Sequence, residues 1–179
     1  MAHLEQQIFF KTLKNKFPNR FENCEVLDIG SLDINGNNRY LFENYKYIGV
    51  DVGPGRNVDV VSKGHEYKSE IKYDIVISSE CFEHDMYYSE TIKNCIELTK
   101  EGGLFTFTCA STGRKEHGTR RSNPQDAPLL LDENEWGDYY KNLTEDDIRN
   151  VINVDNIFTE YYFEYNSTAC DLYFWGIKK

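Results

Sequence analysis

Two histidines and a glutamate follow apolar segments of this sequence, at positions where they could move a proton. Glu80 and His84 come after the apolar run at residues 73–78, and His117 comes after a second run at 104–108. Histidine titrates near neutral pH and could therefore remove the proton of a reacting hydroxyl. We expect His84 or His117 to act as this base and Glu80 to position the reacting molecules. A helix cap at His84 and a solvated loop position at His117 are the structural alternatives.

A second group of residues has the arrangement of a nucleoside-binding site. Asp28, Gly30 and Ser31 stand where the short apolar run at 25–29 ends in a turn, and Asp51 ends the next apolar run. The two features lie about 20 residues apart, as a nucleoside-binding strand–helix–strand unit requires. Glycine lets the backbone approach a ligand, and a following helix would point its N–H groups at that ligand. An ionised Asp51 could accept two hydrogen bonds from a ribose diol, although a solvated strand-end carboxylate is the alternative.

One concentrated basic segment, residues 114–121, stands out in an otherwise acidic chain. Arg120 and Arg121 could hold a phosphate or carboxylate group of a bound molecule. Trp136 and Tyr139 follow soon afterwards and could form an apolar wall, because aromatic rings offer large apolar faces. A solvated surface for the arginines and core packing for the aromatic residues are the alternatives.

The hydrophobic pattern predicts the strands that would bring these residues together. Short runs rich in apolar, β-branched and aromatic residues predict strands at 25–29, 47–51, 58–61, 73–78, 104–108, 157–165 and 169–177. The last two are separated by a short polar turn and form a hairpin. The segment at 109–142 has little periodicity and predicts a long loop, with a short helix inside it as the alternative. We expect this loop to contact the reacting molecule, because such loops in compact domains are usually functional.

Three helices are predicted from helical spacing and from capping residues. An N-terminal helix within 1–20 would end before Pro18 and bury one apolar face, formed by Leu4, Ile8, Phe9, Leu13 and Phe17. A second helix at 86–100 would be capped by Gly102 and Gly103. Thr144 and Asp147 predict a capping box for a third helix that reaches about residue 154.

Strand–helix alternation followed by a hairpin predicts an α/β fold. Alternation implies a mostly parallel sheet with helices on both faces, and the hairpin adds an antiparallel strand. The chain has 179 residues, a usual length for one domain, so we expect residues 1–179 to form a single domain.

Composition limits the partners and the location. The formal net charge of −10 opposes attraction to a phosphate backbone, so no DNA partner is expected. No stretch approaches the roughly 18 apolar residues of a membrane-spanning helix, and the N-terminus does not have a signal-peptide pattern. The five cysteines form no Cys-x-x-Cys pair. This favours reduced thiols in a cytoplasmic protein, and no metal site is predicted.

Four segments together resemble the class I, Rossmann-like S-adenosylmethionine-dependent methyltransferases. They are Val26-Leu-Asp-Ile-Gly-Ser31, Tyr47-Ile-Gly-Val-Asp51, Tyr73-Asp-Ile-Val-Ile-Ser-Ser-Glu80 and Gly102-Gly-Leu-Phe-Thr-Phe107. The resemblance extends from about residue 25 to residue 177. It implies a seven-stranded sheet with a reversed last strand, and a site for S-adenosyl-L-methionine at the carboxyl ends of the first, second and fourth strands. Residues 31–36, 79–85 and 116–119 are similar to a small, mostly uncharacterised bacterial and viral subgroup.

The turn after the first strand departs from the family pattern. The usual Asp-x-Gly-x-Gly-x-Gly would place glycines where this chain has Leu32 and Ile34, and Gly36 comes two residues late. We expect Asp33 or Asn35 to replace the missing glycine contact by binding the amino or carboxylate group of the cofactor. The full set of expected cofactor contacts is Asp28, Gly30, Ser31, Asp33, Asn35, Gly36, Asp51, Val52 and Ser79.

These observations predict methyl transfer, with a hydroxyl of a small molecule, sugar or glycan precursor as the acceptor. Arg120, Arg121 and Tyr139 are the expected acceptor contacts. The chain lacks the Asn/Asp-Pro-Pro-Tyr/Phe motif of amino-methylating DNA enzymes. An RNA- or protein-directed methyltransferase and a non-catalytic binding subunit remain alternatives. A short-chain dehydrogenase is disfavoured because neither Tyr139 nor Tyr140 has a lysine four residues later.

Overall fold

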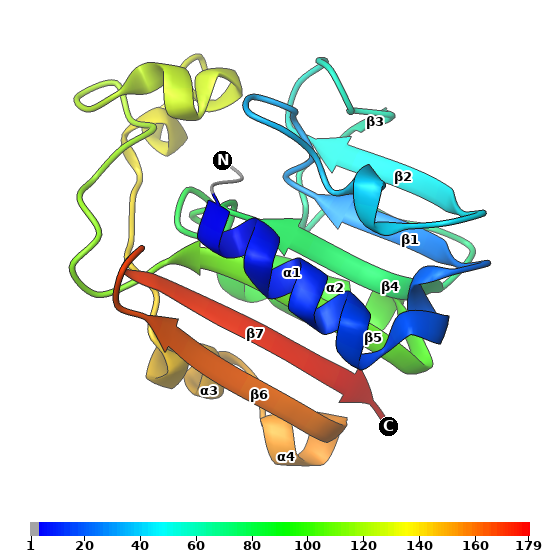
Figure 1. The fold of residues 1–179 in the computed structure, drawn as a ribbon. Coiled ribbons are helices and arrows are strands. Elements are labelled where there is room, and N and C mark those ends of the chain that lie inside the picture. Colours follow the sequence, from blue (N-terminus) through cyan, green and yellow to red (C-terminus); the bar gives the residue numbers. More distant parts are fainter. Residues whose placement is uncertain (1–3) are drawn as a thin grey trace.

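The computed structural model describes residues 4–179 and contains one seven-stranded sheet, in the order β3-β2-β1-β4-β5-β7-β6 (Figure 1). The strands are β1 (Glu25–Ile29), β2 (Lys46–Asp51), β3 (Val60–Val61), β4 (Tyr73–Ser79), β5 (Thr99–Ala110), β6 (Phe158–Asn166) and β7 (Asp171–Lys178). Strands β1 to β5 pair in parallel, whereas β7 lies antiparallel between β5 and β6. The predicted Rossmann-like α/β sheet with a reversed last strand is confirmed.

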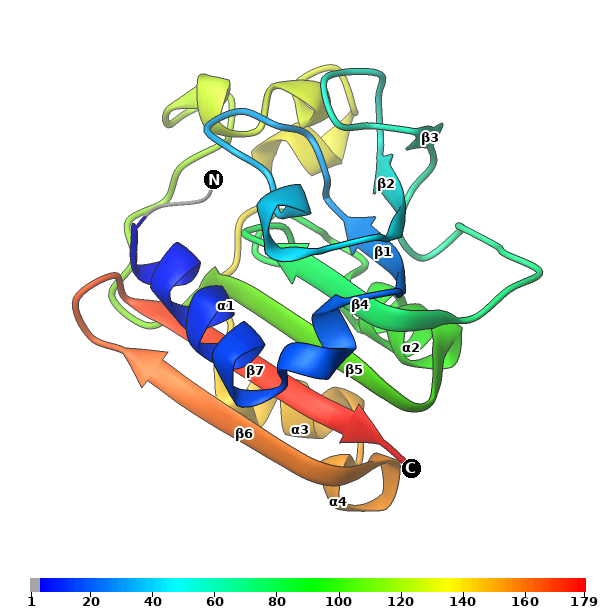
Figure 2. The same ribbon diagram turned by 45° about the vertical axis from the view of Figure 1, so that its right-hand side comes forward.

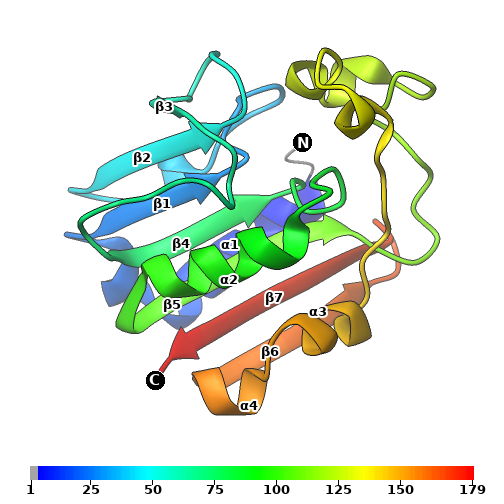
Figure 3. The same cartoon turned by 180° about the vertical axis from the view of Figure 1, so that it is seen from behind.

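Helices cover both faces of the sheet. Helix α1 (Leu4–Lys16) lies on one face, and α2 (Tyr88–Leu98), α3 (Glu145–Val151) and α4 (Val154–Ile157) lie on the other (Figures 1 and 3). The predicted N-terminal segment 1–20 begins with three residues that lie outside the described part of the chain. Among residues 4–179, no helix has the length and apolar character needed to cross a membrane.

Alternation along the central strands gives each face its own hydrophobic core. In β4, Ile75 and Ile77 pack toward α1, while Val76 between them packs toward α2. Side chains of a strand alternate between faces with a period of two residues, which produces this division. Strand β7 runs beneath α1 (Figure 2), where Phe9 contacts Tyr173 with ring centroids 4.8 Å apart.

The buried face of α1 differs from the predicted one. Leu4 and Ile8 are 64% and 54% exposed, whereas Phe9, Phe10 and Leu13 are buried against the sheet. At 100° per residue, positions 9, 10 and 13 share one side of the helix and positions 4 and 8 point to the opposite side. Apolar spacing alone does not decide which of two overlapping stripes faces the sheet.

The two glycines at 102 and 103 do not cap α2, contrary to the prediction. The helix ends at Leu98, and the N–H of Thr99 donates to the Cys95 carbonyl. Gly102 lies near the start of β5 with φ +71°, where the register against β4 shifts between Tyr73 and Ile75. The glycine pair therefore lies in the irregular first part of β5, where the positive φ of Gly102 is accommodated.

Two loops differ from the expected pattern. The described residues between β1 and β2 contain no α-helix, only a 3₁₀ turn at Arg39–Leu41, so the expected helix N-terminus does not follow Gly30. The segment predicted as a loop at 109–142 begins inside β5 and then forms short 3₁₀ turns at Pro124–Asp126, Pro128–Leu130 and Glu135–Asp138.

The start of α3 confirms the predicted capping box. The Thr144 side chain accepts from the N–H of Asp147, and the Asp147 carboxylate accepts from the N–H of Thr144 at 2.9 Å. The helix ends at Val151, earlier than predicted, and the short α4 begins at Val154.

Candidate active site at the carboxyl edge of the sheet

A cavity lies where the carboxyl ends of β1, β2 and β4 meet the segment that carries the three 3₁₀ turns. The space between its wall residues amounts to about 940 Å³, part of which is open to solvent. Among the expected cofactor contacts, the cavity wall includes Asp28, Gly30, Ser31, Gly36, Asp51, Val52 and Ser79. Topology explains this grouping, because parallel strands bring their carboxyl ends to one edge of the sheet.

Asp51 is held by the backbone and faces the cavity. Its Oδ2 accepts from the N–H of Leu32 at 2.9 Å, and its Oδ1 accepts from the N–H of Val52 at 2.8 Å. Burial raises the pKa of Asp51, and these two N–H groups act in the opposite direction. A carboxylate has about four acceptor positions, so each oxygen keeps capacity for one further donor.

Asp28 is a buried carboxyl group in the same wall. Its Oδ2 accepts from the Tyr47 hydroxyl at 2.5 Å, while its Oδ1 accepts no hydrogen bond from the described residues. Burial raises the pKa of Asp28 to about 7, although the Tyr47 hydrogen bond lowers it. A cationic group in the cavity would favour the ionised form.

The loop after β1 uses its polar residues in two different ways. Asp33 accepts from the N–H of Gly36 at 2.7 Å and from the Arg56 guanidinium at 2.7 Å, so it holds the loop together. Asp33 and the exposed Asn35 lie outside the cavity wall, whereas Asn37 and Asn38 are part of it. The sequence analysis missed these two, although their position at the end of the polar run was the available signal.

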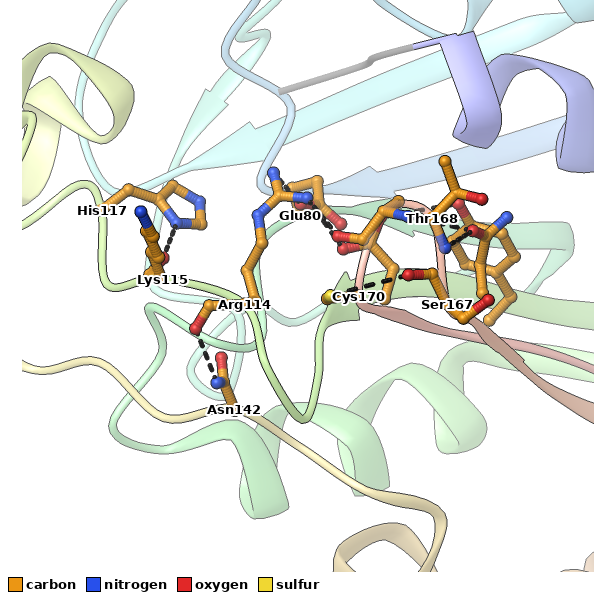
Figure 4. Close-up of polar contacts among 12 residues, drawn as sticks. Glu80, Arg114, Lys115, His117, Asn142, Ser167, Thr168 and Cys170 are labelled. Atoms are coloured by element: carbon orange, nitrogen blue, oxygen red, sulfur yellow. Dashed lines mark hydrogen bonds and ion pairs between the residues drawn. The ribbon is translucent and has the colours of Figure 1, made fainter.

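Glu80 adopts an unusual backbone conformation directly after β4. Its φ is +52°, in the left-handed region, and its N–H donates to the Thr108 carbonyl at 2.8 Å. Such a conformation costs about 1–3 kcal/mol for a residue other than glycine and persists only where the surroundings impose it. The Glu80 carboxylate lies in the cavity wall and points toward Arg114, at 3.8 Å (Figure 4).

The two predicted bases lie together, but only one faces the cavity. His84 is part of the wall, and His117 packs against it with ring centroids 4.9 Å apart. Burial and the neighbouring His117 lower the pKa of His84 to about 3, and burial also lowers the pKa of His117. An efficient base has a pKa near the working pH, so His84 is a weak base at neutral pH.

Glu83 is a third member of this cluster, and it is not among the site residues expected from the sequence. Its side chain is 0% exposed, and no described side chain donates a hydrogen bond to either carboxylate oxygen. Burial, together with the charge of Glu80, raises the pKa of Glu83 well above the usual range. Its place beside His84 in the sequence was the only signal.

The predicted acceptor contacts lie outside the cavity wall. The Arg120 guanidinium donates to the carbonyls of Leu131 and Asn134, both at 2.8 Å, and pairs with Asp138. Arg121 pairs with Glu116 at 3.0 Å. These arginines are used within the loop, which weakens the case for an RNA-directed enzyme.

Of the two aromatic residues expected to contact a ligand from the same loop, one lines the cavity and the other does not. Tyr139 lies outside the wall, but Trp136 is part of it and is buried. The indole Nε1–H of Trp136 donates to the His84 carbonyl. Pro128, Leu129 and Leu130 add apolar surface to the same side of the cavity. The loop therefore contributes an apolar wall, through residues other than the expected Tyr139.

No protein-family model matches this chain, and no curated protein matches it by sequence. Its structure is similar to that of the N-methyltransferase NodS from Bradyrhizobium japonicum WM9, in complex with S-adenosyl-L-homocysteine. The TM-score is 0.62 at 13% identity, covering 99% of this chain and 89% of NodS.

Two further solved structures are similar over nearly the whole chain. One is 1,6-didemethyltoxoflavin-N1-methyltransferase from Burkholderia thailandensis, with a TM-score of 0.60 and 12% identity over 100% of this chain and 92% of that one. The other is magnesium protoporphyrin IX methyltransferase from Synechocystis PCC 6803, with a TM-score of 0.61 and 13% identity over 100% and 89%. Both structures contain S-adenosylhomocysteine. This chain has the Rossmann-like fold of the S-adenosylmethionine-dependent methyltransferases.

Proposed function

We propose that this protein is an S-adenosylmethionine-dependent methyltransferase that methylates a hydroxyl group of a small molecule, with sugars and glycan precursors as the first candidates. The observation that carries the proposal is the cavity that brings Asp28, Asp51 and the loop after β1 together at the carboxyl edge of the sheet. The similar structures bind S-adenosylhomocysteine and supply the fold-level support.

The cavity wall offers a partner for each part of the cofactor. Asp51 keeps two acceptor positions for the ribose diol after its backbone hydrogen bonds are made. The Oδ1 of Asp28 is available to the cationic amino group of the methionine moiety. Leu32, Val52 and Leu129 provide apolar surface for the adenine ring. Asn38 donates to Ser79 at 2.9 Å and fixes that side of the wall.

The protein acts mainly by alignment. When bound, S-adenosylmethionine would supply a sulfonium methyl group for transfer to the acceptor oxygen, with the electron pair of the S–C bond left on sulfur. Positioning two reactants can supply roughly 7–11 kcal/mol of the barrier. Glu80, Trp136 and His84 form the part of the wall beyond Ser79, where the acceptor would lie. The acceptor proton passes to solvent or to a nearby base.

A cavity that is covered on one side and an acidic chain both support a small acceptor. The loop that carries Leu129 and Trp136 covers one side of the cavity. This arrangement favours a small molecule, which can enter the cavity completely, and disfavours a polymer. A cytoplasmic location forms part of the proposal, because the five cysteines are free thiols and reduced thiols are typical of that compartment.

Calorimetric titration of the purified protein tests the proposal. S-Adenosylmethionine and S-adenosylhomocysteine should bind with micromolar affinity, and NAD, as the matched dinucleotide control, should not. Binding of NAD alone would overturn the proposal in favour of a dehydrogenase. Binding of the first two ligands would be followed by a methyl-transfer screen with tritiated cofactor, in which sugars, a short RNA and a protein mixture are compared as acceptors.

A further inference from the structure

Three buried side chains from two loops meet beside the proposed acceptor position. Glu83 and His84 lie in the turn after β4, and His117 comes from the loop after β5. One ligand atom from each residue lies within 4.8 Å of the others, and all three residues are buried. The rings of His84 and His117 stand perpendicular, with an interplanar angle of 90°.

The Glu83 carboxylate needs a partner that the described side chains do not supply. It is completely buried, and no side chain of residues 4–179 donates a hydrogen bond to either oxygen, although the backbone N–H groups of Glu83 and Ala110 lower its pKa. A buried ionised carboxylate is costly unless it is paired or coordinates a metal. A cation between Glu83 and the two imidazoles would supply the missing partner.

The hydrogen bond of His117 leaves its other nitrogen ready to coordinate. Its Nδ1 lies 3.1 Å from the Lys115 carbonyl (Figure 4). A carbonyl only accepts, so Nδ1 carries the proton and Nε2 keeps its lone pair. Histidines that bind metals almost always donate their second N–H in this way. His84 completes the set, because its buried Nδ1 has no hydrogen-bond partner among the described residues.

We propose that Glu83, His84 and His117 form a binding site for a divalent first-row transition-metal ion. Two imidazoles and one carboxylate suit Zn²⁺, Mn²⁺, Fe²⁺ or Co²⁺, whereas Mg²⁺ and Ca²⁺ prefer oxygen ligands. Three protein ligands leave at least one coordination position open, as in catalytic sites. The sequence-based expectation of no metal site missed this cluster, because His117 joins it only through the fold.

The position of the cluster suggests a role, which rests on the proposed function. His84 is part of the cavity wall together with Glu80 and Ser79, so an open coordination position would lie near the acceptor. A hydroxyl bound to a metal ion loses its proton more readily. This would assist methylation of a hydroxyl acceptor.

Direct metal binding tests the proposal without relying on activity. The protein, freed of any histidine tag and treated with a chelator, is titrated with Zn²⁺, Mn²⁺ and Co²⁺ by calorimetry, and bound metal is counted by elemental analysis. We expect one ion per chain and a visible absorption band for bound Co²⁺. Failure of every ion to bind at one per chain would overturn the proposal.

Variants then assign the ligands. Glu83→Gln, His84→Gln and His117→Gln should each weaken binding at least about 100-fold, more than the loss of an outer hydrogen bond does. His65→Gln is the matched control, because His65 lies outside the cluster, and it should bind as the wild type does. Wild-type affinity in all three cluster variants would place the metal elsewhere and contradict the assignment.

Folding and cofactor binding are measured separately, so that each failure can be recognised. Circular dichroism of the metal-free variants identifies any that fail to fold, and Glu83→Gln should fold because it replaces the buried carboxyl group with a neutral amide of similar shape. S-Adenosylhomocysteine is titrated into the metal-free protein. Metal binding without cofactor binding would support this inference and reject the proposed function, and the reverse result would do the opposite.

Discussion

Gly30 lies directly against Cys81: a Cβ atom on Gly30 would stand 2.5 Å from both the Cβ and the Sγ of Cys81. Gly30 follows β1 and Cys81 follows β4, so this contact joins two of the loops that form the cavity wall. Gly30 also has φ +77°, in the left-handed region that glycine adopts without strain.

The contact predicts that Gly30→Ala destabilises the protein more than backbone strain alone would. Gly102→Ala is the matched control, because Gly102 has φ +71° and nothing lies within 4 Å of its added Cβ. Left-handed strain should cost about 1–2 kcal/mol in both variants, and the clash should add about 1–3 kcal/mol in Gly30→Ala only. Urea unfolding measures the loss of unfolding free energy in each variant. Equal losses would show that the two loops move apart and relieve the clash with Cys81.

Asp51→Asn should weaken the binding of S-adenosylhomocysteine by about 10- to 100-fold. The substitution removes the charge and one acceptor oxygen from the proposed ribose site, which corresponds to about 1–3 kcal/mol. The exposed Asp146→Asn is the control and should bind as the wild type does. Calorimetric titration gives both affinities, and an unchanged affinity in Asp51→Asn would remove the ribose assignment.

Asp28 should make the free protein less stable as the pH rises from about 4 to about 7. The pKa of an unfolded aspartate is about 3.9, and burial raises the pKa of folded Asp28 to about 7. Between these values the folded state holds a proton that the unfolded state has lost, so the unfolding free energy falls with pH and levels off above 7.

The variant Asp28→Asn isolates this contribution. The difference in unfolding free energy between wild type and Asp28→Asn should change by up to about 4 kcal/mol across that pH window. Other buried carboxyl groups have raised pKa values as well, and those that do not interact with Asp28 affect both proteins alike; Asp51 interacts with Asp28 electrostatically, so the difference reports the pair. A difference that stays constant with pH would mean that folded Asp28 is ionised throughout.

Trp136 should report ligand binding by fluorescence. The protein contains two tryptophans, of which Trp136 lines the cavity and Trp175 packs in the core beneath α1. We expect S-adenosylhomocysteine to change the emission of wild type and of Trp175→Phe, and to leave that of Trp136→Phe unchanged. A response that follows Trp175 instead would show that the ligand acts away from the proposed site.

Arg120→Ala should loosen the loop that covers the cavity, whereas Arg121→Ala should have a smaller effect. Arg120 donates to the carbonyls of Leu131 and Asn134, whereas Arg121 donates to the Asp138 carbonyl alone and otherwise makes exposed ion pairs. Exposed ion pairs contribute about 0–1 kcal/mol each, while each hydrogen bond to a carbonyl contributes about 0.5–1.5 kcal/mol. Hydrogen exchange at residues 124–138 compares the variants, and equal protection in both would contradict the difference.

Much of the fold was predictable because its signals are local. The apolar runs at β1, β2 and β4, the capping box of Thr144 and Asp147, and the hairpin of β6 and β7 each depend on neighbours in the chain. The predictions that failed required information from elsewhere. The exposed Leu4 and Ile8 show that the sheet surface decides which face of the helix is buried. Gly102 and Gly103 lie where the pairing of β5 with β4 shifts its register, and that pairing joins distant segments.

The sequence by itself determined the sheet and the location of the Asp28 and Asp51 carboxylates at its carboxyl edge. The carboxyl ends of parallel strands reach the same edge of the sheet, whatever conformation the loops adopt. Only the tertiary structure decided which loop residues face the cavity. Asp33 and Arg120 are polar enough to bind a ligand but are paired with their own loops, whereas Asn38 and Trp136 are part of the cavity wall. Glu83 is buried instead. The direction of a loop side chain depends on contacts between segments far apart in the sequence, and residue type and spacing do not contain that information.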